Sequence, residues 1–251
     1  MSREGMSNAQ QEMSNVKVTQ PSPLPAAGTE TTGGPPPSTL HPPPSFRWFT
    51  IPVLLALTAE AATAYRLPYG DEILAFNGLR QEPLNSVFRF ATHLGEAYAY
   101  VVAGVALILL RKYRYAALVA LMGLLILPLS FLLKDQFGIM RPLTWFSQAE
   151  RWQEVVTVPG VTLASGYTSF PSGHTISAFA LYTLLTLMLD WKHRHWGLAF
   201  ALLAVSVGVS RIFLVQHYLA DVLGGTVMGL SVGWLVWRLK SLNVQGSKFE
   251  V

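Results

Sequence analysis

The sequence contains no cysteine, which excludes disulfide bonds and cysteine-ligated metal sites. Charged residues are also scarce, at 13% of the 251 residues, about half of the share that a soluble domain carries. The deficit is concentrated in long stretches with almost no charge, and 51% of the residues are hydrophobic. We therefore predict an all-α integral membrane protein. The net charge of +4 is modest and basic residues lie at the ends of apolar runs, which argues against nucleic acid as a partner.

Residues 1–46 differ from the rest of the chain. They hold nine of the sixteen prolines, together with Gly, Ser, Thr and Gln. Because this composition cannot bury enough apolar surface to offset the entropy of ordering, we predict a disordered cytoplasmic tail. The segment has no apolar run and is not expected to be a cleaved signal peptide. Its proline clusters could dock in an aromatic groove of a partner, but a solvated extension is the simpler interpretation, and no obligate protein partner is inferred.

Six apolar segments approach the length that crosses a bilayer, roughly 17–25 residues. They are residues 48–65, 96–110, 115–133, 174–189, 196–215 and 221–237. The second is short and could extend back towards Phe90, and Glu60 interrupts the first, which is costly unless it faces a partner or water. Residues 67–94 are partly amphipathic, which suits an interfacial helix between the first two spans. The predicted domains are the tail, a six-span domain at 47–240 and a second cytoplasmic tail at 241–251.

The basic residues between the predicted spans set the orientation, because cytoplasmic loops are enriched in Lys and Arg. With six spans, the clusters at 111–114, 192–194 and 238–248 all fall on the side of the N-terminus. Both termini are therefore expected in the cytoplasm. The opposite face collects residues 67–94, 134–173 and 215–221. A bacterial inner membrane, with this face towards the periplasm, is the expected location.

Two polar segments on the outer face carry cations. Lys134 and Arg141 are seven residues apart, two turns along one face if the segment is helical, and ordinary interface anchors are the alternative. Residues 210–221 place Arg211, His217 and Asp221 in apolar surroundings. If this segment is helical, His217 and Asp221 lie one turn apart, and the carboxylate can fix the imidazole tautomer. The alternative here is a helix end with snorkelling polar groups.

A third segment, Pro171-Ser172-Gly173-His174, forms a turn that leads into the fourth predicted span. The first N–H groups of a helix have no partner within the helix and can bind an anion. Ser172 adds a hydroxyl donor, and His174 lies at the mouth of the turn. A capped helix start with an interfacial histidine is the alternative.

The three segments match, in order and without a departure, the signature Lys-x6-Arg-Pro, Pro-Ser-Gly-His and Ser-Arg-x5-His-x3-Asp. The sequence thus resembles the type 2 phosphatidic acid phosphatase superfamily of membrane lipid phosphatases. The resemblance covers residues 48–237 and includes the six-span count. Soluble vanadate-binding haloperoxidases share the signature, but they lack membrane spans.

The resemblance implies a role for each matched residue. His217 would be the nucleophile that forms a phosphohistidine, Asp221 would orient it, and His174 would protonate the leaving oxygen and then activate water. Five groups would hold the phosphoryl oxygens: Lys134, Arg141, Arg211, the Ser172 hydroxyl and the Gly173 N–H. Because three cations can neutralise a phosphoryl group as Mg²⁺ does elsewhere, we expect no metal or other cofactor. A zinc site of His174, His217 and Asp221 is the alternative, which repulsion from the cations disfavours.

The predicted function is a metal-independent phosphatase that acts at the outer leaflet on a phosphorylated lipid, such as an isoprenoid diphosphate, phosphatidic acid or phosphatidylglycerol phosphate. A phosphotransferase with the same site and a non-catalytic membrane scaffold or transporter are the alternatives. The loop at 143–170 is expected to cover or flank the pocket.

Two lesser features complete the sequence-based expectations. Glu96 could tune a histidine or shape the lipid entrance, although a helix-start carboxylate favoured by the helix dipole is the preferred interpretation. Gly224, Gly225 and Gly229 are expected to let helices approach closely.

Overall fold

The computed structural model describes residues 42–43 and 46–246, which lie within one compact unit, Thr39–Val251. Within these residues the secondary structure is helical throughout, without a strand, which confirms the all-α prediction. The predicted disordered tail lies outside the described residues, apart from residues 42, 43 and 46.

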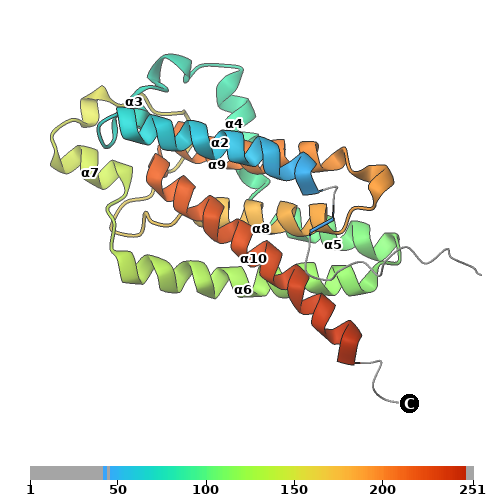
Figure 1. Cartoon of the computed structure of the whole chain (residues 1–251). Coiled ribbons are helices and arrows are strands. Elements are labelled where there is room, and N and C mark those ends of the chain that lie inside the picture. Colours follow the sequence, from blue (N-terminus) through green and yellow to red (C-terminus); the bar gives the residue numbers. More distant parts are fainter. Residues whose placement is uncertain (1–41, 44–45, 247–251) are drawn as a thin grey trace, which may run out of the picture. The chain divides into compact units, whose positions relative to one another are not determined.

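The helices follow one another along the chain, and Figure 1 labels the α-helices among them. They are α2 (Arg47–Arg66), α3 (Asp71–Leu74), η2 (Asn77–Leu79), α4 (Leu84–His93), α5 (Ala97–Leu109), α6 (Tyr113–Phe137), α7 (Pro142–Gln148), η3 (Trp152–Glu154), α8 (Gly173–Leu187), η4 (Trp191–His193), α9 (Trp196–Phe213) and α10 (Leu219–Gly246). Among the described residues, four segments are long and apolar enough to cross a membrane: α2, α6 continued by α7, α9 and α10. If the bent pair of α4 and α5 is counted as one span, these residues hold up to five candidate spans. α8 is apolar but shorter. A count of six spans, which requires α8 to cross as well, stays a prediction.

The second predicted span begins differently from the expectation. α4 and α5 are separate helices that meet at an angle of 62°, so the span does not continue towards Phe90 as one straight helix. The turn between them packs closely on its neighbours. A Cβ atom added to Gly95 would lie 2.7 Å from the carbonyl oxygen of His174 and 2.7 Å from Cγ1 of Val207. The absence of a side chain at this position therefore lets the turn lie against α8 and α9.

α8 is the central helix of the bundle, packed between α6, α9 and α10 (Figure 1). Eleven of its fifteen residues are buried. α10 approaches it along Gly225, Gly229 and Gly233, where an added Cβ would lie 2.6–2.9 Å from a backbone oxygen at residues 172–180. Since lipid provides no hydrophobic drive between helices, such close packing of small residues is what associates them. The packing role predicted for Gly225 and Gly229 is confirmed, and it holds the starts of α8 and α10 together.

The outward faces of α2, α5 and α6 carry large apolar side chains that are exposed, among them Leu55, Val102 and Leu127. Soluble proteins rarely expose contiguous apolar surfaces of this extent. These faces fit a hydrocarbon environment, and the chain is an integral membrane protein.

Candidate active site

The three predicted segments meet at one end of the bundle. Lys134 is in the last turn of α6, Arg141 precedes α7, and Asp221 is in the first turn of α10. The N–H of Ser172 donates to the backbone oxygen of Asp221 at 3.1 Å, and the Arg141 guanidinium donates to the backbone oxygen of Gln216 at 3.0 Å. These hydrogen bonds bring the three segments into contact. The sequence alone predicted only that they lie on the same side of the membrane.

The helical geometry expected for two of these segments was wrong. α6 ends at Phe137, where Gly138 adopts a left-handed φ of 58°, so Lys134 and Arg141 do not share a helical face. α9 ends at Phe213 and α10 begins at Leu219, which leaves His217 in the junction between them. The contacts form nonetheless, because each residue lies at or beside a helix end that points towards the same site.

His217 and Asp221 form a buried pair, with each side chain 2% exposed. Nδ1 of His217 lies 3.2 Å from Oδ2 of Asp221, and the same oxygen accepts hydrogen bonds from the Tyr218 N–H at 2.9 Å and the Ser169 hydroxyl at 2.5 Å. Nε2 of His217 lies 3.3 Å from Nη1 of Arg141, which is a donor only. The network thus assigns the proton to Nδ1 and the lone pair to Nε2.

The charge state of His217 follows from its surroundings. Burial holds the pKa of the imidazole well below its ordinary value, and the positive charges of Arg211, Arg141 and Lys134 lower this pKa further. A neutral imidazole is the nucleophilic form, so His217 has a free electron pair at physiological pH. The same result shows that all three predicted cations act on this ring.

The turn before α8 has the features of an anion cradle. The Ser172 hydroxyl accepts a hydrogen bond from Oγ1 of Thr175 at 2.8 Å, so its own proton remains for another acceptor. A Cβ added to Gly173 would lie 2.7 Å from Oγ of Ser130 and 3.7 Å from Nζ of Lys134. The Lys134 ammonium therefore lies beside the start of α8, where the first helical N–H groups attract negative charge.

Arg211 adds a second donor to this region. Its Nη1 donates to Oγ1 of Thr92 at 2.5 Å, and the residue is 7% exposed. Within the described part of the chain, its buried Nε has no hydrogen-bond partner. A buried donor without an acceptor is uncommon in proteins, and a phosphoryl oxygen is a suitable acceptor for this one.

Glu96 was interpreted from the sequence as a helix-start carboxylate, but its side chain contacts two histidines. It precedes α5, but its side chain makes no capping hydrogen bond. Instead Oε1 lies 3.3 Å from Nε2 of His174, and Oε2 lies 3.0 Å from Nδ1 of His93. The alternative interpretation, contact with a histidine, matches the structure.

Other contributors to the site were missed in the sequence. Ser169 and Thr92 hold Asp221 and Arg211, and Glu72, which is buried, accepts from the N–H of Leu219 at 3.3 Å. Burial raises the pKa of Glu72. A single serine or threonine gives no signal of this kind in the sequence. The only available hint was the concentration of polar residues at 67–94, which was assigned to the membrane interface.

Metal binding was the competing use of the histidines. Among the residues that the structure describes, no group of three or more His, Asp or Glu side chains is placed to hold a metal ion. Independence from metal stays a prediction about the reaction.

A helical membrane bundle with a buried imidazole–carboxylate pair and a cationic anion cradle defines a phosphoryl-transfer enzyme of the membrane. The sequence profile of the PAP2 superfamily matches residues 112–245, which contain all three motifs. The chain belongs to the PAP2 superfamily, and it is a phosphatase.

Individual relatives agree with this assignment. The chain is 32% identical over 171 residues to phosphatidylglycerophosphatase B of Bacillus subtilis (strain 168), covering 63% of this chain and 76% of that protein. It is 34% identical over 74 residues to undecaprenyl-diphosphatase BcrC of the same organism, covering 30% and 36%. The crystal structure of the first transmembrane PAP2 type phosphatidylglycerolphosphate phosphatase from Bacillus subtilis superposes with a TM-score of 0.51 at 26% identity, covering 82% of this chain and 98% of that chain.

Proposed function

We propose that this protein hydrolyses the phosphomonoester or diphosphate group of a membrane lipid, without a metal ion, through a phosphohistidine on Nε2 of His217. The observation that carries the proposal is the environment of that nitrogen. Asp221 holds the opposite nitrogen of the ring, and burial, together with the positive charges of Arg211, Arg141 and Lys134, lowers the pKa of the imidazole.

The reaction would proceed in two displacements. First, the lone pair of Nε2 attacks phosphorus while the ester oxygen leaves with a proton from His174. Arg141, whose Nη1 lies 3.3 Å from Nε2, would exchange this contact for a phosphoryl oxygen. Second, His174 takes a proton from water, the resulting hydroxide oxygen attacks phosphorus, and the P–N bond breaks. Inorganic phosphate leaves and His217 regains its lone pair.

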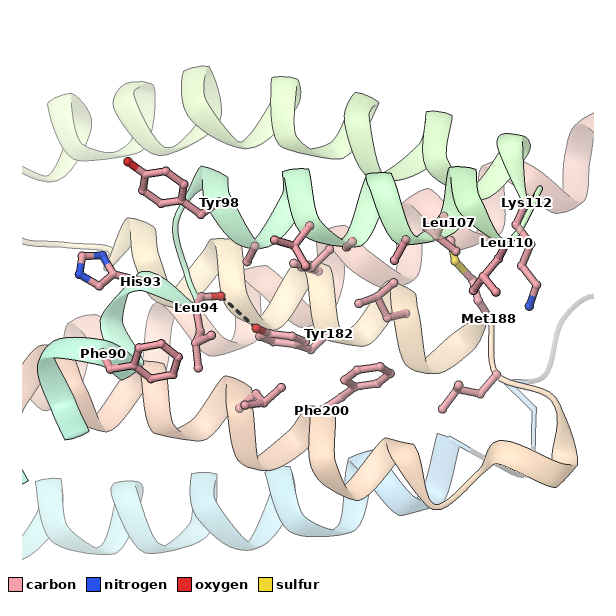
Figure 2. A pocket seen from close by; sticks show the side chains of 18 residues that line it. Phe90, His93, Leu94, Tyr98, Leu107, Leu110, Lys112, Tyr182, Met188 and Phe200 are labelled. Atoms are coloured by element: carbon pink, nitrogen blue, oxygen red, sulfur yellow. Dashed lines mark hydrogen bonds between the residues drawn. The ribbon is translucent and has the colours of Figure 1, made fainter. Parts of the chain in front are cut away.

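An apolar pocket beside the site supports a lipid substrate. Its volume is about 650 Å³, and it lies between α5 and the helices α8 and α9. Figure 2 shows His93 and Phe90 at one end and Lys112 and Met188 at the other. The lining follows α5 from Tyr98 to Leu110, a length of about 18 Å at 1.5 Å per residue. A hydrocarbon chain in this pocket would place its headgroup near His93, which shares Glu96 with His174.

The membrane topology is part of the proposal. We propose six spans with α8 as the fourth, an interfacial placement for the region of α3 and α4, and a bacterial inner membrane. The basic clusters described above support a periplasmic site with both termini in the cytoplasm. The domain boundaries at 46 and 240 remain part of this proposal, although α10 continues to Gly246.

The test is phosphate release by the purified full chain in detergent with excess chelator. The substrates are undecaprenyl diphosphate, phosphatidic acid, phosphatidylglycerol phosphate and a sugar phosphate. We expect release from one or more lipids and little from the sugar phosphate. His217→Ala should abolish release, whereas His193→Ala, at an exposed histidine paired with Asp190, should leave it unchanged.

Three outcomes would count against the proposal. Release by His217→Ala would exclude the nucleophile, and a loss of activity with chelator would restore the metal alternative. An absence of phosphate release, together with transfer of the phosphoryl group to an added acceptor lipid, would favour the phosphotransferase. Radiolabel from the substrate should also remain on the denatured wild-type protein as an acid-labile adduct, and this adduct should be absent from His217→Ala.

A further inference from the structure

The carboxylate of Glu96 bridges two imidazoles. Its Oε1 lies 3.3 Å from Nε2 of His174, and its Oε2 lies 3.0 Å from Nδ1 of His93. The side chains of His174 and Glu96 are 33% and 29% exposed, whereas His93, which also lines the apolar pocket, is 58% exposed. The bridge thus runs from the surface to the residue proposed as the acid and base.

The backbone fixes Glu96 at this position. It lies in the turn between α4 and α5, where Gly95 packs against the backbone of His174. The Tyr182 hydroxyl donates to the carbonyl oxygen of Leu94 at 3.1 Å, the hydrogen bond drawn in Figure 2. Both anchors belong to α8, the helix that carries His174. Glu96 is therefore held relative to this histidine by two contacts that do not involve its own side chain.

The charges around His174 explain why it needs a carboxylate. Several charged or titratable groups surround the start of α8: Glu96 and His93 from the α4–α5 region, Lys134 from α6, Arg211 from α9, His217 from the junction and Asp221 from α10. A general acid must be protonated before it can donate a proton. The positive charge of a protonated His174 is unfavourable beside Lys134 and Arg211.

We propose that Glu96 is the positioning residue of His174, with the role that Asp221 has for His217. Glu96 accepts the Nε2–H of His174, which leaves Nδ1 as the nitrogen that gives a proton to the leaving oxygen and later takes one from water. The carboxylate also balances the positive charge of the protonated ring. His93 holds the other carboxylate oxygen and so fixes its orientation. This inference rests on the proposed function.

The consequence depends on the leaving group. Cleavage of a lipid phosphomonoester expels an alkoxide, a strong base that must be protonated as it leaves. Cleavage of an isoprenoid diphosphate expels a phosphate group, which is a far weaker base. Loss of Glu96 should therefore impair hydrolysis of the monoester much more than that of the diphosphate. A purely structural contribution would impair both equally.

The first experiment compares Glu96→Gln with wild type on phosphatidylglycerol phosphate and on p-nitrophenyl phosphate, whose leaving group needs little protonation. We expect kcat/KM for the lipid, which reports the phosphorylation of His217, to fall by roughly 10²-fold, within the range that a general acid contributes, and kcat/KM for the aryl ester to change several-fold at most. The basic limb of the pH profile for the lipid should move to lower pH. Glu82→Gln is the matched control, because Glu82 is a second α4-region carboxylate, paired with the exposed Arg89.

Equal losses on both substrates, or an unchanged basic limb, would refute the positioning role. A second measurement does not depend on turnover. In the full chain labelled with ¹⁵N-histidine, the protonated fraction of His174 across a pH series should fall in Glu96→Gln and not in Glu82→Gln, with His174→Gln used to assign the signal. An unchanged fraction overturns the inference even if the protein hydrolyses nothing, whereas release by His217→Ala overturns only the proposed function.

Discussion

The contact between α8 and α10 sets the distance between the two halves of the site, and Gly225→Ala tests it. Gly225 lies one turn after Asp221, and its neighbour across the contact is the start of α8. A Cβ at this position would lie 2.9 Å from the carbonyl oxygen of Ser172, 2.9 Å from Cβ of Thr175 and 3.2 Å from its Cγ2. Two of these atoms belong to the backbone or are bonded directly to it, so a change of rotamer cannot relieve the contact.

The expected magnitude follows from these distances. An ordinary carbon contact requires about 3.5 Å or more, so the two helix starts must separate by roughly half an ångström. Misplacement by 1 Å can cost about 10²-fold in rate, and half of that shift predicts about a tenfold fall in kcat. Overpacking costs about 1–3 kcal/mol, and the better helix propensity of alanine returns at most about 1 kcal/mol. The net loss in the free energy of unfolding is therefore about 0–2 kcal/mol.

The assay is phosphate release together with thermal unfolding in the same detergent. Gly104→Ala on α5 is the matched control, because an added Cβ there meets no atom within 4 Å. It should retain wild-type kcat. Full activity and unchanged unfolding temperature in Gly225→Ala would refute the claim that the site requires this close approach. An equal loss in Gly104→Ala would show that any glycine replacement is harmful.

Two further predictions concern the buried pair. Asp221→Asn should lower kcat by about 10³–10⁴-fold, the scale seen when a triad carboxylate becomes an amide. The reason is that the amide can donate to Nδ1 and reverse the tautomer of His217. Retention of a tenth of the activity in a folded variant would contradict this prediction. Burial and the cations lower the pKa of His217 below its ordinary value of 6.5, so the unfolded chain binds a proton that the folded protein excludes. Stability should therefore fall as pH drops below about 6.5, by at most about 1.4 kcal/mol per pH unit, and His217→Gln should flatten this slope in pH-dependent thermal unfolding. An identical slope in the variant would exclude His217 as the cause.

The three motifs could be predicted from the sequence because their residue types and spacing are local. The all-α class followed from the apolar runs, and Lys134, Arg141, Arg211 and the two histidines come together as expected. The helical geometry around His217 could not be obtained in this way, because the break between α9 and α10 occurs in an apolar stretch without proline or glycine. Periodicity continues through such a stretch, whereas the backbone leaves the helix at Val215, which has a left-handed φ of 58°.

The partners of the site residues were less predictable, for a physical reason. Glu96 and His174 are 78 residues apart, and Thr92 and Arg211 are 119 apart. Such pairs depend on the 62° bend between α4 and α5, where the turn packs against α8 and α9 at Gly95. A carboxylate at a helix start has an adequate local explanation in the helix dipole. Only the tertiary structure shows that this one contacts His174.

The charges of the assembled site support the prediction that it binds phosphate rather than a divalent metal. Apart from the two imidazoles, three cations, Lys134, Arg141 and Arg211, stand against two carboxylates, Asp221 and Glu96. One positive charge is in excess, and binding of a phosphomonoester dianion changes this excess to one negative charge. A divalent ion would instead raise the excess to three positive charges in surroundings of low dielectric. Each carboxylate is already bound to an imidazole, so neither could turn to a metal without releasing the histidine that it positions.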